Sequence, residues 1–271
     1  MAEEAREFAL LCARCGEENP PGFPVCWSCN AQLRAAPEPG AEPAPATTPQ
    51  SDPAARAARR KRLLLEVAVV LAVAWLPFAW LPLLGGEALA TDSATPPTTL
   101  RLYWLADELG TLALLGYLAS LDGDWRRFLG LRRPQAADIA WAAGAMIAVL
   151  TSDIVARRLA LALHFAQEES LAPGPEAGPA WIRLLELTVG ALLEEVLYRA
   201  YLWKRFTELS GRPALSIVVA SLLFTLTHGY PLEGSLAVFL CGLALGWIFR
   251  ARQSLFAVVL GHLGYNLFLT G

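Results

Sequence analysis

Two glutamates and an arginine interrupt the apolar stretch ALLEEVLYRAYLWKRF, which runs from Ala191 to Phe206. Glu195 and Arg199 are four residues apart, so on a helix they share one face and can form an ion pair. Glu194 is rotated by about 100° from its neighbour and has no such partner within the helix. A carboxylate held among apolar groups can act as a general base on a water molecule or bind a metal ion. Glu194 is therefore the first candidate for a catalytic residue.

Two of the three histidines lie in later apolar stretches. SLLFTLTHGY places Phe224 and His228 four residues apart, and GHLGYN places His262 and Asn266 four apart, so each pair lies on one helix face. An imidazole can orient a water molecule or bind a metal, and an amide N–H can stabilise an oxyanion. A lone histidine in a membrane is more often a hydrogen-bonded bundle residue, but two with an unpaired glutamate favour a site. The third, His164, lies in a mixed loop and is assigned no role.

The composition indicates a membrane protein. The chain has 271 residues, 55% of them hydrophobic and 17% charged, with a mean hydropathy of +0.41. The net charge of -3 is too small to favour nucleic acid as a partner. The first sixty or so residues are polar and proline-rich and contain no apolar run, so we expect no cleavable signal peptide.

Seven apolar stretches and the placement of the basic residues predict an all-α polytopic membrane protein. The expected spans are about 63–84, 100–120, 136–155, 181–203, 213–230, 235–249 and 254–270. Basic loops alternate with acidic or neutral ones, which places the N-terminus in the cytoplasm and the C-terminus outside; Arg157 and Arg158 are the exception. A charge in the middle of such a helix costs about 2.5–3.5 kcal/mol, so Glu194, Glu195 and Arg199 must face protein, water or metal. The second span carries two acidic residues, Asp107 and Glu108, which either line the same cavity or mark a tilted or interfacial helix.

The N-terminal segment contains two C-x2-C pairs in CARCGEENPPGFPVCWSC, formed by Cys12, Cys15, Cys26 and Cys29. Four thiolates can bind one structural zinc ion tetrahedrally; two disulfides are the alternative, which a cytoplasmic location disfavours. The stretch resembles small zinc-ribbon modules that often precede bacterial membrane domains. We therefore predict a zinc ribbon at 1–34 that docks a cytosolic partner, a disordered Pro/Ala-rich linker at 35–60, and a transmembrane domain at 61–271.

The C-terminal motifs resemble those of the CPBP family, the CAAX-protease and bacteriocin-processing intramembrane proteases, also called Abi or type II CAAX endopeptidases. The ordered set E-E-x-x-x-R, F-x-x-x-H and H-x-x-x-N within about 181–271 carries the resemblance. It implies a bacterial-type plasma-membrane peptidase that acts on a peptide or protein in or near the bilayer. The residues that it assigns to the site are Glu194, Glu195, Arg199, His228, His262 and Asn266.

The resemblance also implies roles for these residues. Glu194 and His228 would activate the water, while His262 and Asn266 would bind the oxyanion. The family is described both as metalloproteases and as glutamate-dependent enzymes. In the first case a catalytic zinc ion would be held by His228, His262 and Glu194.

Glu195 and Arg199 would act behind the water-activating groups by fixing the helix and orienting them. Three alternatives remain open at the level of sequence. The charges can form a purely structural network, or the protein can be a non-catalytic scaffold or bacteriocin self-immunity protein of the same fold. A coupled transporter is less favoured, because the sequence shows no internal repeat.

Overall fold

The computed structural model describes residues 10–12, 18–19, 33, 53–83, 97–121, 125–164 and 179–270. Two short antiparallel strands, β1 (Leu10–Leu11) and β2 (Glu18–Asn19), precede the helices, and Cys12 follows β1 and is buried. Cys15, Cys26 and Cys29 lie outside the described residues. The zinc ribbon therefore stays a prediction.

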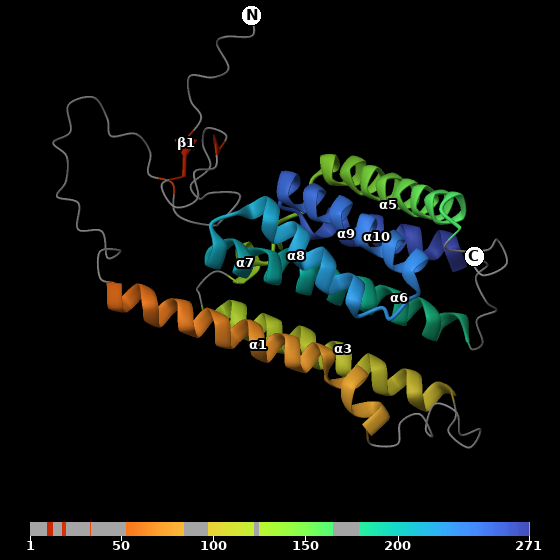
Figure 1. Cartoon of the computed structure of the whole chain (residues 1–271), viewed down its shortest axis with the longest axis horizontal. Helices are drawn as coiled ribbons and strands as arrows, with labels where there is room; N and C mark the ends of the chain where they lie inside the picture. Colours follow the sequence, from red (N-terminus) through yellow and green to blue (C-terminus); the bar gives the residue numbers. More distant parts are fainter. Residues whose placement is uncertain are drawn as a thin grey trace, which may run out of the picture.

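The rest of the described chain is helical (Figure 1). The elements are α1 (Pro53–Leu83), α3 (Pro97–Ser120), α4 (Trp125–Phe128), α5 (Ala136–Ala162), α6 (Ala180–Glu194), the π-helix η3 (Glu195–Leu202), α7 (Trp203–Ser210), α8 (Pro213–Leu226), α9 (Leu232–Arg252) and α10 (Leu255–Thr270). Each of the seven expected spans overlaps a helix. The number that cross a bilayer stays a prediction.

Two helical boundaries differ from those expected from the sequence. α1 begins at Pro53, within the segment assigned to the linker, because PAARAARRKR combines proline at the first helical position with strong helix formers. The rest of the expected linker lies outside the described residues. α8 ends at Leu226, before the expected end at residue 230, and Gly229 adopts a left-handed backbone with φ of 61°. His228 therefore follows the helix instead of lying on it.

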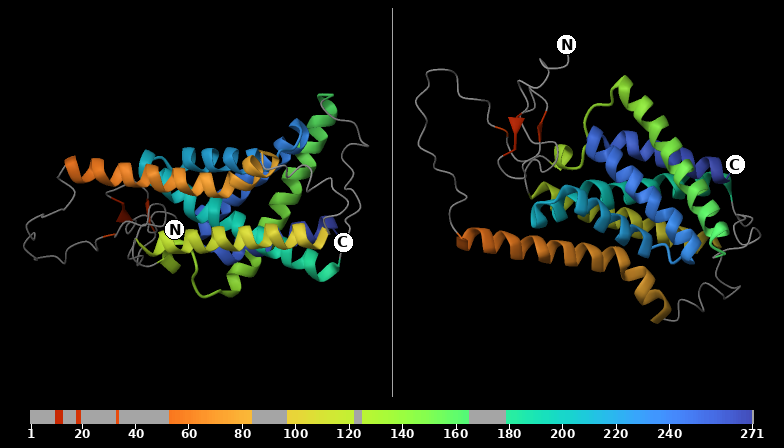
Figure 2. Two further views of the ribbon diagram at one scale, coloured as in Figure 1. Left: turned by 90° about the horizontal axis from the view of Figure 1, so that it is seen from below. Right: turned by 45° about the horizontal axis from the view of Figure 1, so that its top comes forward.

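The helices form two groups that meet along α6 and η3. α5 packs against α9 and α10, and α8 packs against α9, while α3 packs against α6 and α1 against α3. In Figure 1, α1 and α3 run along the lower side of the molecule and α5 along the upper side. Figure 2 shows α5 running alongside α9, and the left view shows it at a steep angle to α1 and α3. Residues of η3 and α7 provide much of the buried apolar core between the groups.

Apolar side chains cover the outward faces of several helices. In the described part of the chain, α5 and the stretch Gly234–Arg252 of α9 are long and apolar enough to cross a membrane, and α8 and α10 are apolar but shorter. Exposed large apolar side chains of α5 include Ile139, Ile147, Ile154 and Leu159. Exposed apolar faces of this kind are typical of surfaces that contact lipid or another protein.

Charged residues that flank the predicted spans meet at one end of the bundle. Arg132 and Arg252 both pair with the buried carboxylate of Asp138, which ties the loop before α5 to the end of α9. Lys204 of α7, itself buried, donates a hydrogen bond to the carbonyl of Phe128 in α4. These contacts bring the loop before α5 and the ends of α4, α7 and α9 together, and the cytoplasmic location of these ends stays a prediction.

α1 is attached to the core by buried ion pairs. Glu66 of α1 lies 3.0 Å from Arg205 Nη2 and accepts a hydrogen bond from the Tyr201 hydroxyl at 3.3 Å. Arg62 of α1 also pairs with Glu66, at 2.7 Å. The helix that leads from the N-terminal segment is thus joined directly to η3 and α7, the part of the chain that continues from the E-E-x-x-x-R motif.

Candidate active site

The π-helix η3 carries the motif that the sequence singled out. η3 begins at Glu195, directly after Glu194 ends α6, and extends to Leu202. In a π-helix the backbone hydrogen bonds span five residues instead of four, and such turns are frequent at functional sites. All eight residues of η3 are buried. Its position between the two helix groups allows residues of α8 and α10 to reach it.

Glu194 lies between two imidazole rings. Its Oε1 is 3.8 Å from Nε2 of His228, and its Oε2 is 3.7 Å from Nε2 of His262. Both distances exceed a direct hydrogen bond and are suited to contact through a water molecule. The side chain of Glu194 is 30% exposed, so the carboxylate is accessible. Glu194 thus lies close to one residue that follows α8 and to one residue of α10, and its catalytic role stays a prediction.

Each imidazole is oriented through its other nitrogen. Nδ1 of His228 lies 2.8 Å from the carbonyl oxygen of Phe224, which can only accept, so Nδ1 carries the proton and Nε2 of a neutral ring keeps its lone pair. Nδ1 of His262 lies 2.9 Å from Oε1 of Glu195, and this carboxylate oxygen accepts a hydrogen bond from the Nδ1–H group. In both cases Nε2 is the nitrogen that faces Glu194.

Glu195 and Arg199 form a buried pair behind His262. Arg199 Nε is 3.3 Å from Glu195 Oε2, and the two side chains are 3% and 0% exposed. The two glutamates therefore differ in exposure: Glu194 is accessible to water, whereas Glu195 is fully buried. The predicted ion pair is confirmed, and its partner on α10 is His262.

Phe224 packs at the centre of the cluster. The Arg199 guanidinium carbon lies 4.2 Å above its ring, and the His228 ring meets it edge-on at 4.7 Å between centroids. Tyr198 contacts the same ring at 5.2 Å, and its hydroxyl is 3.2 Å from that of Thr227. The F-x-x-x-H spacing thus supplies both the carbonyl that orients the histidine and the ring that separates it from the buried ion pair.

Asn266 lies one turn beyond His262 on α10 and is half-buried. The contacts described above join the other five predicted site residues to one another. The participation of Asn266 in the site stays a prediction. Among the described residues, no group of three or more His, Cys, Asp or Glu side chains is arranged to hold a metal ion. The donor set of two Nε2 atoms and a carboxylate is chemically suited to zinc, but these side chains do not converge as metal ligands do.

α3 brings a further carboxylate toward the site. Glu108 Oε1 lies 3.4 Å from the position that a Cβ atom on Gly190 would occupy, so the absence of a side chain there lets Glu108 contact α6. The charges of Glu108 and Glu194 interact, and Oε2 of Glu108 is buried. The sequence left two possibilities for Asp107 and Glu108: lining the same site as Glu194, or marking a tilted or interfacial helix. For Glu108 the first possibility is favoured.

The residues of this cluster lie in a region that matches a protein-family model. Residues 176–268 match the model of the type II CAAX prenyl endopeptidases, described as Rce1-like. This Rce1-like region covers about a third of the chain and contains all six residues that the sequence assigned to the site. It agrees with the resemblance carried by the motifs, whereas the N-terminal segment lies outside it. Searches among curated proteins and among solved structures gave no match.

Proposed function

We propose that the protein is an intramembrane endopeptidase that hydrolyses peptide bonds by glutamate-activated water. The observation that carries this proposal is the position of the accessible Glu194 carboxylate, with one oxygen facing Nε2 of each histidine. The match of the surrounding region to peptidase sequences supports it. Family similarity alone does not define a reaction, so the proposal rests mainly on the geometry of the site.

In the proposed reaction a water molecule sits between Glu194 Oε1 and His228 Nε2. His228 Nε2 accepts one hydrogen bond and orients the water, and Glu194 takes its proton as the oxygen attacks the carbonyl carbon. The tetrahedral intermediate then collapses, the C–N bond breaks, and the protonated Glu194 gives its proton to the departing amine. Glu194 thus acts first as a base and then as an acid.

The oxyanion needs hydrogen-bond donors on the other side of the carbonyl. The amide of Asn266 can donate in any protonation state. His262 can donate from Nε2 only as an imidazolium, because its Nδ1 proton is already held by Glu195. Glu195 therefore positions His262 and favours its charged form, while Arg199 fixes the Glu195 carboxylate, and neither residue touches the substrate.

A peptide library tests this function. Purified full-length protein is incubated with peptides of diverse sequence, some carrying a prenylated cysteine near the C-terminus, and products are read by mass spectrometry. We expect cleavage by the wild type that disappears in Glu194→Gln. Glu186→Gln is the matched control, because Glu186 lies on the same helix and pairs with Arg101 at 2.5 Å.

Two further arms separate the alternatives. Cleavage that persists with a strong chelator supports glutamate chemistry, whereas loss that zinc restores supports a metal held by His228, His262 and Glu194. Equal cleavage by the wild type and Glu194→Gln would refute the proposed base. If the folded wild type cleaves no peptide, with or without the prenyl group, the scaffold or self-immunity alternative is favoured.

A further inference from the structure

The guanidinium of Arg199 has more donors than the protein atoms around it use. Its Nε faces Glu195 at 3.3 Å, and its central carbon lies over the Phe224 ring. Nη1 and Nη2 are both buried, and neither has a hydrogen-bond partner among the described residues. The two nitrogens carry four N–H groups between them, and buried donors of a charged group are costly to leave unsatisfied.

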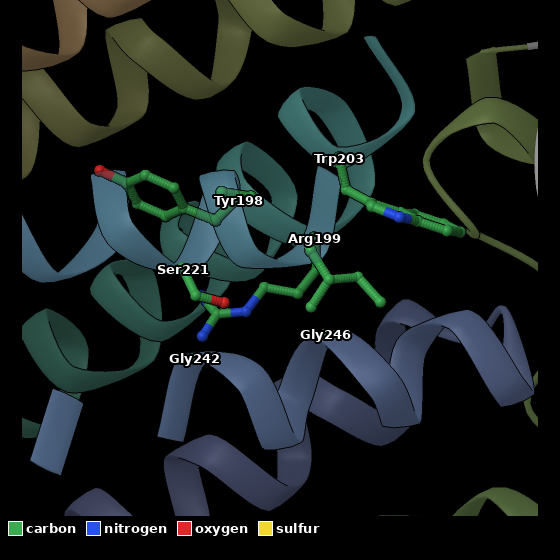
Figure 3. A pocket seen from close by; sticks show the side chains of 8 residues that line it. Tyr198, Arg199, Trp203, Ser221, Gly242 and Gly246 are labelled. Atoms are coloured by element: carbon green, nitrogen blue, oxygen red, sulfur yellow. The ribbon is translucent and has the colours of Figure 1, made fainter. Parts of the chain in front are cut away.

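A small cavity lies beside these donors. It is lined by Tyr198, Arg199, Trp203, Ile217, Ala220, Ser221, Gly242 and Gly246, at the crossing of η3, α8 and α9. Figure 3 shows the Arg199 guanidinium beside the Ser221 side chain, with the α9 backbone at Gly242 opposite. The cavity therefore offers a polar corner in otherwise apolar surroundings.

The glycines of α9 keep this space open. A Cβ atom at Gly242 would lie 3.0 Å from Ser221 Cβ and 3.2 Å from its hydroxyl oxygen. At Gly246 it would lie 2.7 Å from a methyl carbon of Ile217. Gly242, Ser221 and Arg199 line the same cavity, so a side chain at Gly242 would press on Ser221 and on the Phe224 ring, 3.3 Å away, and would take up space there.

The size of the cavity limits what it can hold. The space open to a water-sized sphere is about 10 Å³, and one water molecule needs roughly 10–15 Å³ of such space. A carboxylate, with three heavy atoms, needs more.

We propose that this cavity binds one internal water molecule that accepts hydrogen bonds from Nη1 and Nη2 of Arg199. The water satisfies the outer half of the guanidinium while Nε stays with Glu195. It thereby completes a chain from the cavity through Arg199 and Glu195 to His262. The effect on His262 rests on the proposed function, but the water site does not.

The first test is an experimental structure of the full-length wild-type protein at a resolution that shows ordered water, from crystals grown with and without bromide. We expect one water molecule within about 3.2 Å of Nη1 and Nη2 and no anomalous signal from bromide there. Bromide in the cavity would replace the proposal by an anion site. Protein acceptors on both nitrogens, with no water between, would overturn it.

The second test is a double-mutant cycle that needs no catalytic assay. Gly242→Ala fills the cavity, and we expect it to lower the thermal unfolding midpoint more in the wild type than in Arg199→Met, which no longer needs the water. Gly264→Ala is the matched control, because its Cβ would lie at a similar 3.1 Å from Met146 Sδ, in a different contact. Equal losses from Gly242→Ala in both backgrounds would overturn the proposal. If Arg199→Met does not fold, the wild-type structure decides.

Discussion

Nδ1 of His262 lies 2.9 Å from Oε1 of Glu195, and this contact joins α10 to the π-helix η3. It links the last helix of the chain to the E-E-x-x-x-R motif through two buried side chains. Because the contact uses Nδ1, it fixes the ring with Nε2 toward Glu194. The two adjacent glutamates therefore have different surroundings, and the proposed reaction gives them different tasks, one at the reacting water and the other behind a histidine.

Glu195→Gln should reduce cleavage without abolishing it. The amide oxygen can still accept a hydrogen bond from His262 Nδ1, but the negative charge that pairs with Arg199 is lost. Removing an orienting partner of this kind costs about 10–100-fold in activity, whereas Glu194→Gln should leave no measurable turnover. Steady-state kcat and KM of both variants check this. The reverse order of severity would assign the base to Glu195.

Glu108 should tolerate loss of its charge better than reversal. Glu108→Gln keeps the contact with α6 at Gly190, so cleavage should stay close to that of the wild type. Glu108→Lys would bring a cation toward Glu194. Because the Glu194 carboxylate would then be held in an ion pair, kcat/KM should fall at least about tenfold. Asp107→Lys is the control, because the neighbouring position is rotated by about 100° on α3. Identical effects of the two lysines would show that α3 does not line the site.

Gly261 should not accept a methyl group. A Cβ atom there would lie 2.5 Å from Ala145 Cβ and 2.7 Å from the carbonyl oxygen of Ala142, so α5 and α10 would have to separate. We expect Gly261→Ala to destabilise the protein by about 1–3 kcal/mol and to displace the adjacent His262.

Thermal unfolding in detergent measures this effect. Gly116→Ala on α3, which meets no atom within 4 Å, is the control and should be neutral or stabilising. Adding Ala145→Gly to Gly261→Ala should restore part of the loss. An unchanged unfolding midpoint in Gly261→Ala would contradict the close packing of these helices.

Lys204 should make stability depend on pH. It follows the fourth predicted span, and burial lowers the pKa of its ammonium group to about 7 from a usual value of 10.5. Between these values the unfolded chain binds the proton and the folded chain does not, so the free energy of unfolding rises with pH in this window. The gain is complete above the unfolded pKa.

Lys204→Met should flatten this rise, as unfolding midpoints measured from neutral to alkaline pH will show. Lys61→Met is the control, because Lys61 is exposed on α1. If the wild type and Lys204→Met have the same slope, the ammonium group is not the origin of the effect.

Zinc should be bound by the N-terminal cysteines. Elemental analysis of the purified full-length protein is expected to give one zinc ion per chain, lost in the double variant Cys15→Ser, Cys26→Ser. Cys241→Ser should retain it, since Cys241 is buried in α9 and its thiol donates to the carbonyl of Val149. Zinc that survives the double variant but is lost on replacing His228 and His262 would place the metal at the candidate active site.

Sequence spacing was sufficient for two pairs of residues that lie four apart in the chain. The four-residue separation of Glu195 and Arg199 anticipated their ion pair, and that of Phe224 and His228 anticipated their contact. Apolar lengths anticipated the helices, because a span needs enough residues to cross the bilayer. The fit of both histidines around Glu194 followed from their number and position, although no distance could be derived.

Other features depend on packing and leave little trace in the sequence. The π-helix is one, because nothing in EVLYRAYL distinguishes it locally from an α-helix. The approach of Glu108 to α6 is another, since it depends on the register between α3 and Gly190. The end of α8 before His228 depends on the left-handed turn at Gly229, where glycine followed by tyrosine and proline gave a signal that was available.

The π-helix also makes the chain sensitive to changes in its length. Each of its turns holds about one residue more than an α-turn, so the helix from Ala180 to Ser210 is out of phase with an uninterrupted α-helix. Deleting one residue between Glu195 and Leu202 would relax the backbone to α-geometry and rotate α7, with its buried Lys204 and Arg205, relative to Glu194. A point substitution in this segment changes the contacts of one side chain. A single-residue deletion would change the positions of all the following side chains of α7 relative to Glu194.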